Sequence, residues 1–527
     1  MTYRELEQLF AKRRISRRQF LQGAAALGAV SLASGVLGPS AFASSGGGGR
    51  LRVGVGHGSS GDSLDPATFE NDFTRALAYA HHNYICEITA DGDVAPELAE
   101  SWETDDAKTW VVHLRRGVEF HNGREMTADD VIASFNHHRG DDTVSAASVL
   151  LEPVVEIRKD DDYTVVFQLE DANADFMFIC ADDHIAIKPA NDNGTIDATD
   201  GIGAGPYVLR DFDPGVSANL ERFGNYWKEG KPHFAEVELL SIHDQSARTN
   251  ALMTDELDVI DSVDLATVHR LKEVPGIVVD ESLGYRHNTF TMRTDTAPFD
   301  NSDVRLAVKY AVDRQQLIDT VLRGYGVRGN DHPISPQNRF HAGDLPQREY
   351  DPDRARHHLE RAGLDRLEVT LHAANAAFDG AVDAAVLFQE TAREAGIDIN
   401  VVRAPDDGYW SDVWMVEPFK AVYWSGRVTE DMVFSTTYSA GADWNDTFWE
   451  HDRFNTLLRQ ARSELDEDRR AEMYHEMQSI LRDDGGAVIP MFENYVFARR
   501  DRVENDGNLA GNRNLDGMKF SERWWGA

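Results

Sequence analysis

Alternating apolar and polar residues predict short β-strands from one end of the chain to the other. The alternation is clearest over residues 51–55, 110–114 and 164–169, where every second side chain is apolar, as in a strand with one buried face. Residues 154–157 form a hairpin partner for 164–169, and residues 487–492 give a final strand before a polar tail. This distribution predicts a fold built on sheets.

Helical periodicity with recognisable start and stop signals separates these strands. Thr127 to Asp130 has the form of a capping box, so a helix is expected over 131–137. Residues 453–481 are predicted to form one long amphipathic helical region, rich in charge pairs four residues apart. A strand, a helix and a strand between residues 367 and 402 make a βαβ unit. The chain is therefore predicted to be a mixed α/β protein.

The first 43 residues have the pattern of an export signal. Paired arginines, Arg17 and Arg18, precede a weakly apolar run, and an Ala-x-Ala site ends at Ala43. The run is diluted by Gly and Ser, and a membrane span needs roughly 20 mostly apolar residues. We expect a twin-arginine signal peptide over 1–43, with an amphipathic surface helix or an uncleaved anchor as the alternative. Residues 44–50 are a Ser/Gly linker, expected to be flexible.

The chain is strongly acidic. Its net charge is −37, and the signal holds six basic and two acidic residues, so removing it leaves −41. Nucleic acids and anionic lipids need cationic surfaces, which this composition disfavours. The acidity is typical of solvation in a salty medium, where ions screen self-repulsion, and we interpret it as halophilic adaptation.

Cys86 and Cys180 are the only cysteines of the chain. An oxidising compartment permits one bridge between them, and two separate buried thiols are the simpler expectation. No cysteine lies near the predicted cleavage site, so a lipid-anchored mature N-terminus is not expected. The mature product is predicted to be a free, soluble protein of the periplasm.

Three ordered motifs resemble a known family. The three motifs are Leu98–Glu103, Trp110–Gly123 and Met126–Phe135. Shorter matches lie before and after them, at Ser63–Pro66, Gly203–Tyr207 and Pro298–Asp313. Together they resemble the family 5 extracellular solute-binding proteins, the periplasmic peptide-binding components of ABC importers.

The resemblance implies a fold and a domain organisation. The expected fold class is α/β, a two-lobed periplasmic-binding-protein fold of type II, of the large peptide-binding class, with mixed sheets flanked by helices. Lobe one would comprise 51–288 and 493–527, with an inserted subdomain at about 85–200, and lobe two would comprise 289–492. Ligand would bind between the lobes and favour a closed state that docks on a membrane permease. We expect a monomer, working with a permease and ATPase complex and without a cofactor.

The resemblance also indicates where the ligand chemistry lies. In peptide-binding relatives an Asp in a Trp-x-Gly-Asp-like stretch holds the peptide amine, and Arg427 stands at that position here. A guanidinium suits a carboxylate or another oxyanion, so we hypothesise an anionic ligand group. The alternative is that Arg427 pairs internally with Glu430 or Asp431. The predicted ligand residues of lobe two are Trp424, Gly426, Arg427 and Trp444.

Two further groups of residues complete the predicted site. The loop after the first strand and the segment that follows it are expected to contribute from lobe one. Other aromatic residues near Trp424 are expected to belong mainly to the core; they are Tyr409, Trp410, Trp414, Tyr438 and Trp449. The predicted ligand residues of lobe one are His57, Gly58, Ser59, Phe69 and Asn71.

Enzymatic and metal-binding motifs are absent from the sequence. Residues 53–58 lack the Gly spacing of a dinucleotide fingerprint, and no nucleophile elbow or Cys-x-x-Cys motif occurs. Asp182 and Asp183 are interpreted as solvated surface. The protein is therefore not expected to be an enzyme, and its expected ligand is a short peptide or a peptide-like acid such as an opine. The alternatives are an oligosaccharide, a nickel chelate, or a ligand sensor on the same fold.

Overall fold

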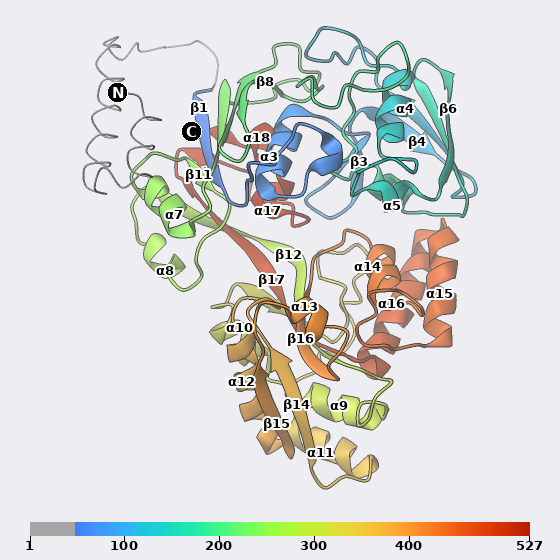
Figure 1. Cartoon of the computed structure of the whole chain (residues 1–527), viewed down its shortest axis with the longest axis vertical. Coiled ribbons are helices and arrows are strands. Elements are labelled where there is room, and N and C mark those ends of the chain that lie inside the picture. Colours follow the sequence, from blue (N-terminus) through green and yellow to red (C-terminus); the bar gives the residue numbers. More distant parts are fainter. Residues whose placement is uncertain (1–47) are drawn as a thin grey trace, which may run out of the picture. The chain divides into compact units, whose positions relative to one another are not determined.

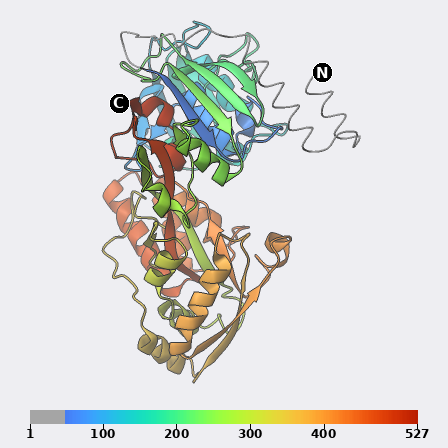
Figure 2. The same ribbon diagram turned by 90° about the vertical axis from the view of Figure 1, so that its left-hand side faces the viewer.

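An eleven-stranded sheet runs through residues 48–527, the part of the chain that the computed structural model describes (Figure 1). Its strand order is β15-β14-β16-β12-β17-β11-β1-β10-β9-β8, and β13 also pairs with β17. The predicted signal peptide, residues 1–43, lies outside the described residues. Strands β12 (Ile277–Met292) and β17 (Ala487–Arg500) are long and antiparallel, and they run between the two halves of the sheet (Figures 1 and 2).

We call residues 48–276 and 501–527 lobe one. Here β1 lies between β10 and β11 and is parallel to both, and its apolar side chains pack on helix α3 in one core. The strands are β1 (Arg50–Val55), β8 (Tyr207–Asp213), β9 (Ser217–Arg222), β10 (Glu236–Ser241), β11 (Val259–Ile260), β18 (Val503–Glu504) and β19 (Trp525–Gly526). The helices are η1 (Pro66–Thr68), α3 (Asp72–His81), α7 (Gln245–Met253), α8 (Val268–Leu271), α17 (Asn514–Gly517) and α18 (Phe520–Arg523).

A subdomain within lobe one has its own sheet and its own core. Four antiparallel strands in the order β4-β5-β7-β6 are packed against α4, whose predicted capping box at Thr127 and Asp130 is present. The strands are β2 (Cys86–Ile88), β3 (Val94–Pro96), β4 (Ala99–Glu103), β5 (Thr109–Leu114), β6 (Val154–Asp161) and β7 (Thr164–Leu169). The helices are α4 (Ala128–His137), α5 (Ser148–Leu151) and α6 (Phe176–Ile179). Cys86 and Cys180 are buried here as free thiols.

We call residues 293–486 lobe two. The predicted βαβ unit is confirmed, because β14 and β15 are parallel and α12 connects them. The strands are β13 (Gly326–Arg328), β14 (Leu367–Ala373), β15 (Ile397–Arg403) and β16 (Phe419–Trp424). The helices are α9 (Ser302–Tyr310), α10 (Arg314–Thr320), α11 (Pro352–Arg361), α12 (Ala381–Glu394), α13 (Tyr409–Asp412), α14 (Glu430–Thr437), α15 (Asp452–Ser463) and α16 (Glu467–Asp484).

Two sequence predictions about the C-terminal third are wrong in detail. The single helical region over 453–481 is two helices, because Glu464 is extended and the Asp466 side chain caps α16. The predicted strand over 487–492 is only the first half of β17, which continues to Arg500. The second half of β17 pairs with β11 and β12 and packs into the cores of lobe one. The local sequence pattern does not reveal these contacts with distant segments.

The segment predicted as a polar tail is part of the lobe-one core. Phe520 and Trp524 are fully buried, and the Trp524 ring stacks on Phe497 with centroids 5.7 Å apart. Lys519 donates to the buried carboxylate of Glu97 at 2.5 Å. The prediction is wrong because these few apolar residues bury large areas although the segment around them is polar.

Among residues 48–527, no helix combines the length and the apolar character that crossing a bilayer requires.

Candidate ligand-binding site

Strand β16 places the predicted lobe-two residues beside the long strand β12, which joins the two lobes. The two strands are antiparallel, with Trp424 opposite His287. At Gly426 an added Cβ would lie 2.2 Å from the Cβ of Tyr285, so only glycine lets the loop approach β12 this closely. Thr429 then caps helix α14. Gly426 thus positions the loop that carries Arg427.

Arg427 has no carboxylate partner among residues 48–527. Its guanidinium donates only to carbonyls of its own loop, at 3.4 Å to Ser425 and 3.2 Å to Gly426. Glu430 instead accepts from the backbone N–H of Phe340 at 2.7 Å, and Asp431 pairs with Arg462 at 3.1 Å. The alternative of an internal ion pair for Arg427 is therefore wrong.

Charged groups of lobe one act on Arg427. Burial lowers the pKa of its guanidinium, and the positive charge of Arg513 lowers this pKa further, whereas Asp182 acts in the opposite direction. Burying a charge is unfavourable unless it is paired. Arg427 is therefore a partly buried cation whose charge Asp182 offsets only in part.

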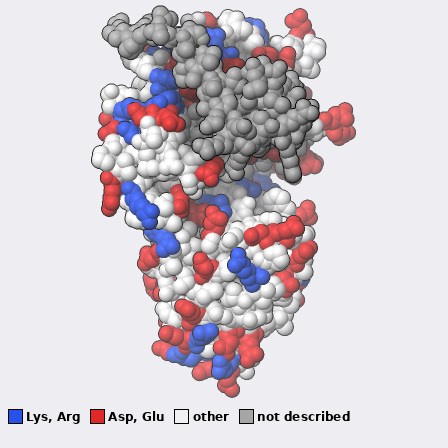
Figure 3. Space-filling model, turned by 60° about the vertical axis from the view of Figure 1, so that its left-hand side comes forward, with Lys and Arg blue, Asp and Glu red and all other residues white. Residues whose placement is uncertain are grey.

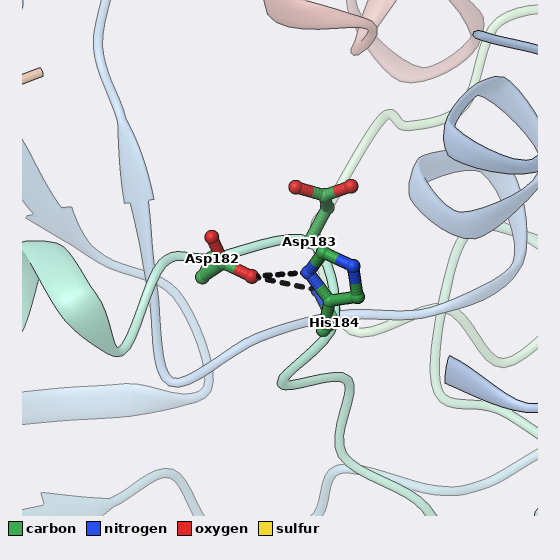
Figure 4. A group of neighbouring side chains, drawn as sticks. All are labelled: Asp182, Asp183 and His184. Atoms are coloured by element: carbon green, nitrogen blue, oxygen red, sulfur yellow. Dashed lines mark hydrogen bonds and ion pairs between the residues drawn. The ribbon is translucent and has the colours of Figure 1, made fainter. Parts of the chain in front are cut away.

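Asp182, Asp183 and His184 lie together on the lobe-one side (Figure 4). Asp183 is fully buried and pairs with Arg75 at 2.9 Å and with Arg513. Asp182 Oδ1 accepts from Nδ1 of His184 at 2.6 Å. The prediction that both aspartates are solvated surface is wrong for Asp183, because the two arginines compensate its charge and permit its burial.

These three residues could in principle offer ligands to a metal ion. Their donor atoms lie within 4.8 Å of one another. The carboxylate of Asp183 is already bound by two guanidiniums, and Nδ1 of His184 is bound to Asp182. Two arginines would also repel a divalent cation, so this donor set does not fit a metal.

Three of the predicted lobe-one residues are engaged in the fold. An added Cβ at Gly58 would lie 2.3 Å from Oγ of Ser241. Phe69 is 1% exposed, with its ring 6.3 Å from that of His82. Asn71 caps helix α3, accepting from the backbone of Thr74 at 3.0 Å. Packing and capping thus account for Gly58, Phe69 and Asn71.

His57 and Ser59 are exposed. His57 follows β1 with a positive φ of 68°, and its Nδ1 lies 3.5 Å from Oδ2 of Asp72. The hydrogen bond to Asp72 raises the pKa of His57. Ser59 closes a turn, in which its N–H donates to Asp62 at 2.9 Å. Of the lobe-one predictions, these two residues have side chains accessible to a ligand.

The aromatic residues near Arg427 divide into two groups. Tyr438 and Trp449 are buried in the core between α14, α15 and α16. Trp424 is partly buried and Trp444 is 48% exposed, and their ring centroids are 6.3 Å apart. The predicted pair Trp424 and Trp444 is therefore brought together beside the loop that carries Arg427.

Sequence reasoning missed Arg513, Asp182 and Asp183. Arg513 lies in the segment that was predicted to be a polar tail, 86 residues beyond Arg427 in the printed sequence. No local pattern indicates that these residues meet. Only the return of the chain to lobe one through β17 brings Arg513 to Asp183.

The two lobes, the hinge strands that join them and the mixed sheet define a type II periplasmic-binding-protein fold. Residues 93–446 match the model of the bacterial extracellular solute-binding proteins, family 5 middle region. The chain belongs to this family. Residues 14–34 match the twin-arginine translocation signal, so the chain carries an export signal.

Individual relatives support this assignment. The dipeptide-binding protein of Escherichia coli strain K12 is 28% identical over 439 residues, which are 75% of this chain and 80% of the relative. The structure of HbpA2 from Haemophilus parasuis has a TM-score of 0.79 at 21% identity, covering 89% of this chain and 99% of that one. AgaA from A. tumefaciens R10, solved with agropinic acid, has a TM-score of 0.71 at 23% identity, covering 91% and 99%. The last two likenesses show the shared fold.

Proposed function

We propose that this chain is the periplasmic solute-binding component of an ABC importer. Its ligand is a short peptide or a peptide-like, anionic solute of the opine type, bound between the lobes and delivered to a membrane permease. The protein acts as a free monomer without a lipid anchor or a cofactor, and it catalyses no reaction. The family assignment and the names of the relatives support the transport role.

Arg427 carries the proposal for an anionic ligand. The sequence resemblance places Arg427 where an aspartate is expected to hold the amine of a peptide, and its guanidinium donates only to two carbonyls of its own loop. A guanidinium binds a carboxylate through two parallel hydrogen bonds. A ligand carboxylate at Arg427 would supply the compensating charge that the described part of the chain does not supply in full.

The charge of the chain supports a small solute rather than a polyanion. The net charge is −37, and acidic side chains are spread over the face in Figure 3, with basic ones interspersed. Binding to nucleic acid or to an anionic bilayer needs clustered lysine and arginine. We therefore propose that the anionic ligand is recognised at a single partly buried cation, Arg427.

A thermal-shift screen tests the proposal. The mature protein is heated with dipeptides, opine-type acids, oligosaccharides or nickel–histidine chelates, each with and without its acidic group where the chemistry allows. A ligand at 100 times its Kd adds about 2.7 kcal/mol of stability, which raises the melting temperature measurably. We expect stabilisation by acids of the peptide or opine class. Stabilisation by oligosaccharides or nickel chelates alone would refute the proposed ligand class.

Transport is tested separately. Deletion of the gene, or replacement of Arg17 and Arg18 by lysines to block export, should abolish uptake of the solute found in the screen. Normal uptake without the protein would refute the importer role and favour a ligand sensor on the same fold.

A further inference from the structure

Four tryptophan rings form a continuous series that includes Trp424, the last residue of β16. The centroid distances are 5.8 Å between Trp410 and Trp414, 6.3 Å between Trp414 and Trp424, and 6.3 Å between Trp424 and Trp444. We call Trp410, Trp414, Trp424 and Trp444 the tryptophan series. Each contact lies within the range at which aromatic side chains attract one another.

The two ends of the tryptophan series are open to solvent. Trp410 is 41% exposed and Trp444 is 48% exposed, whereas Trp449 of the neighbouring core is 2% exposed. Large aromatic side chains contribute most when they are buried. Four adjacent tryptophans with both ends exposed are therefore poorly explained by core packing alone.

Two buried polar residues, Lys420 and Asp446, lie next to the tryptophan series and bind to each other or to it. Trp414 Nε1 donates to Oδ2 of Asp446 at 3.2 Å, and Nζ of Lys420 donates to the carbonyl of Asp446 at 2.6 Å. Asp446 and Lys420 are fully buried. A sugar needs free polar partners for its hydroxyls beside an aromatic surface. Oδ1 of Asp446 and Nε1 of Trp424 have no hydrogen-bond partner in the described part of the chain, but both atoms are buried. A sugar hydroxyl cannot reach them, so the accessible surface suits an apolar ring.

We propose that the tryptophan series is a subsite for an aromatic ring of the solute whose acidic group binds Arg427. This inference rests on the proposed function, because it places the acid and the ring on one ligand. Trp424 ends β16 and Arg427 follows it by three residues. Three residues span at most about 11 Å of backbone, so one solute of dipeptide size can contact both side chains. The subsite makes the protein selective for acidic solutes that carry an aromatic side chain.

Calorimetric titration of the mature protein with two dipeptides, Phe-Glu and Ala-Glu, tests the subsite. The two peptides share their charged groups and differ in the ring. We expect Phe-Glu to bind wild-type protein at least about tenfold more tightly than Ala-Glu, since stacking and burial of the ring both favour binding. Equal affinity would overturn the subsite.

Substitutions in the tryptophan series test whether the aromatic ring of Phe-Glu binds there. Trp410→Ala and Trp444→Ala, made separately, are expected to reduce the ratio of the Phe-Glu affinity to the Ala-Glu affinity to about threefold or less. Trp525→Ala is the matched control, because Trp525 is a partly exposed tryptophan of lobe one whose ring lies edge-on to His233. This variant should keep the full preference. A preference that survives both site substitutions would overturn the assignment, and circular dichroism verifies that each variant is folded.

The outcomes separate this inference from the proposed function. If Ala-Glu binds, Arg427→Gln weakens it and Phe-Glu gains nothing, only the ring subsite fails. If neither dipeptide binds, both proposals fail for this ligand class.

Discussion

Two regions are predicted to bind ligand, residues 57–71 of lobe one and residues 424–444 of lobe two. They differ in how far their side chains are engaged in packing and hydrogen bonding within the fold. In the first region Gly58, Phe69 and Asn71 are engaged in packing and capping. In the second region Arg427 has no acidic partner among the described residues, and Trp444 is half exposed. Side chains already engaged in the fold contribute to stability, and those that remain unengaged are available to a ligand. Substitutions should therefore affect unfolding in lobe one and binding in lobe two.

The largest effect is expected from Phe69→Ala. Phe69 is almost fully buried, and removing a buried phenylalanine ring costs about 3 to 5 kcal/mol of unfolding free energy. Urea denaturation measures the loss, and Phe69→Leu, which fills part of the space, should lose less. A variant with wild-type stability and weakened binding would place Phe69 in the ligand site and reverse the comparison.

Arg427→Gln is expected to weaken ligand binding and to leave the stability of the protein nearly unchanged. The affinity for an acidic ligand should fall at least about tenfold, or about 1.4 kcal/mol, because glutamine keeps hydrogen bonding but removes the charge. The free energy of unfolding should change by no more than about 0.5 kcal/mol. Titration calorimetry and urea denaturation of the same preparation measure both quantities. A large stability loss with unchanged affinity would show that Arg427 is structural.

Asn71→Ala should lower stability by about 1 kcal/mol, the usual contribution of an N-cap side chain. Its amide oxygen accepts from the backbone of Thr74 at the start of α3. Asn71→Ser keeps a capping acceptor without placing a carboxylate against Asp62, which accepts from Nδ2 of Asn71 at 2.7 Å, and is expected to retain more stability than Asn71→Ala. If thermal unfolding of Asn71→Ala matched that of the wild type, the capping role would be excluded.

The smallest effect concerns the pH dependence of His57. Its hydrogen bond to Asp72 raises the pKa of His57 in the folded protein above its usual value. The stabilisation is therefore fully present below the unfolded pKa, about 6.5, and is lost as the pH rises through the folded pKa. NMR titration of the imidazole should give a pKa above 6.5 in the wild type and a lower one in Asp72→Asn. Identical values in both proteins would contradict the contact.

The sequence predicts correctly those elements whose pattern involves only residues close together in the chain. The capping box at Thr127 and the βαβ unit of β14, α12 and β15 follow from residues that are neighbours in the chain, and both are present. The extension of β17 and the burial of Trp524 depend on contacts with distant segments. Such contacts override local polarity, so the prediction of a polar C-terminal tail is wrong.

In the candidate site, too, the sequence indicates residues that belong to a local motif and does not indicate contacts between distant segments. Arg427 was found because its position in a motif departs from the family pattern. Arg513 and Asp183 were missed because their ion pair joins segments separated by 330 residues. Asp183 was interpreted as surface because an acidic pair is usually solvated, and only its contacts with Arg75 and Arg513 explain its burial.

The central claim is that Arg427 binds an acidic group of the ligand. The most direct test is a thermodynamic cycle by calorimetry, in which the strongest acidic ligand from the screen and its amide derivative are titrated into wild-type protein and into Arg427→Gln. We predict that converting the acid to the amide weakens binding to the wild type at least about tenfold, about 1.4 kcal/mol, and has little effect on binding to Arg427→Gln. The same loss in both proteins would contradict the claim.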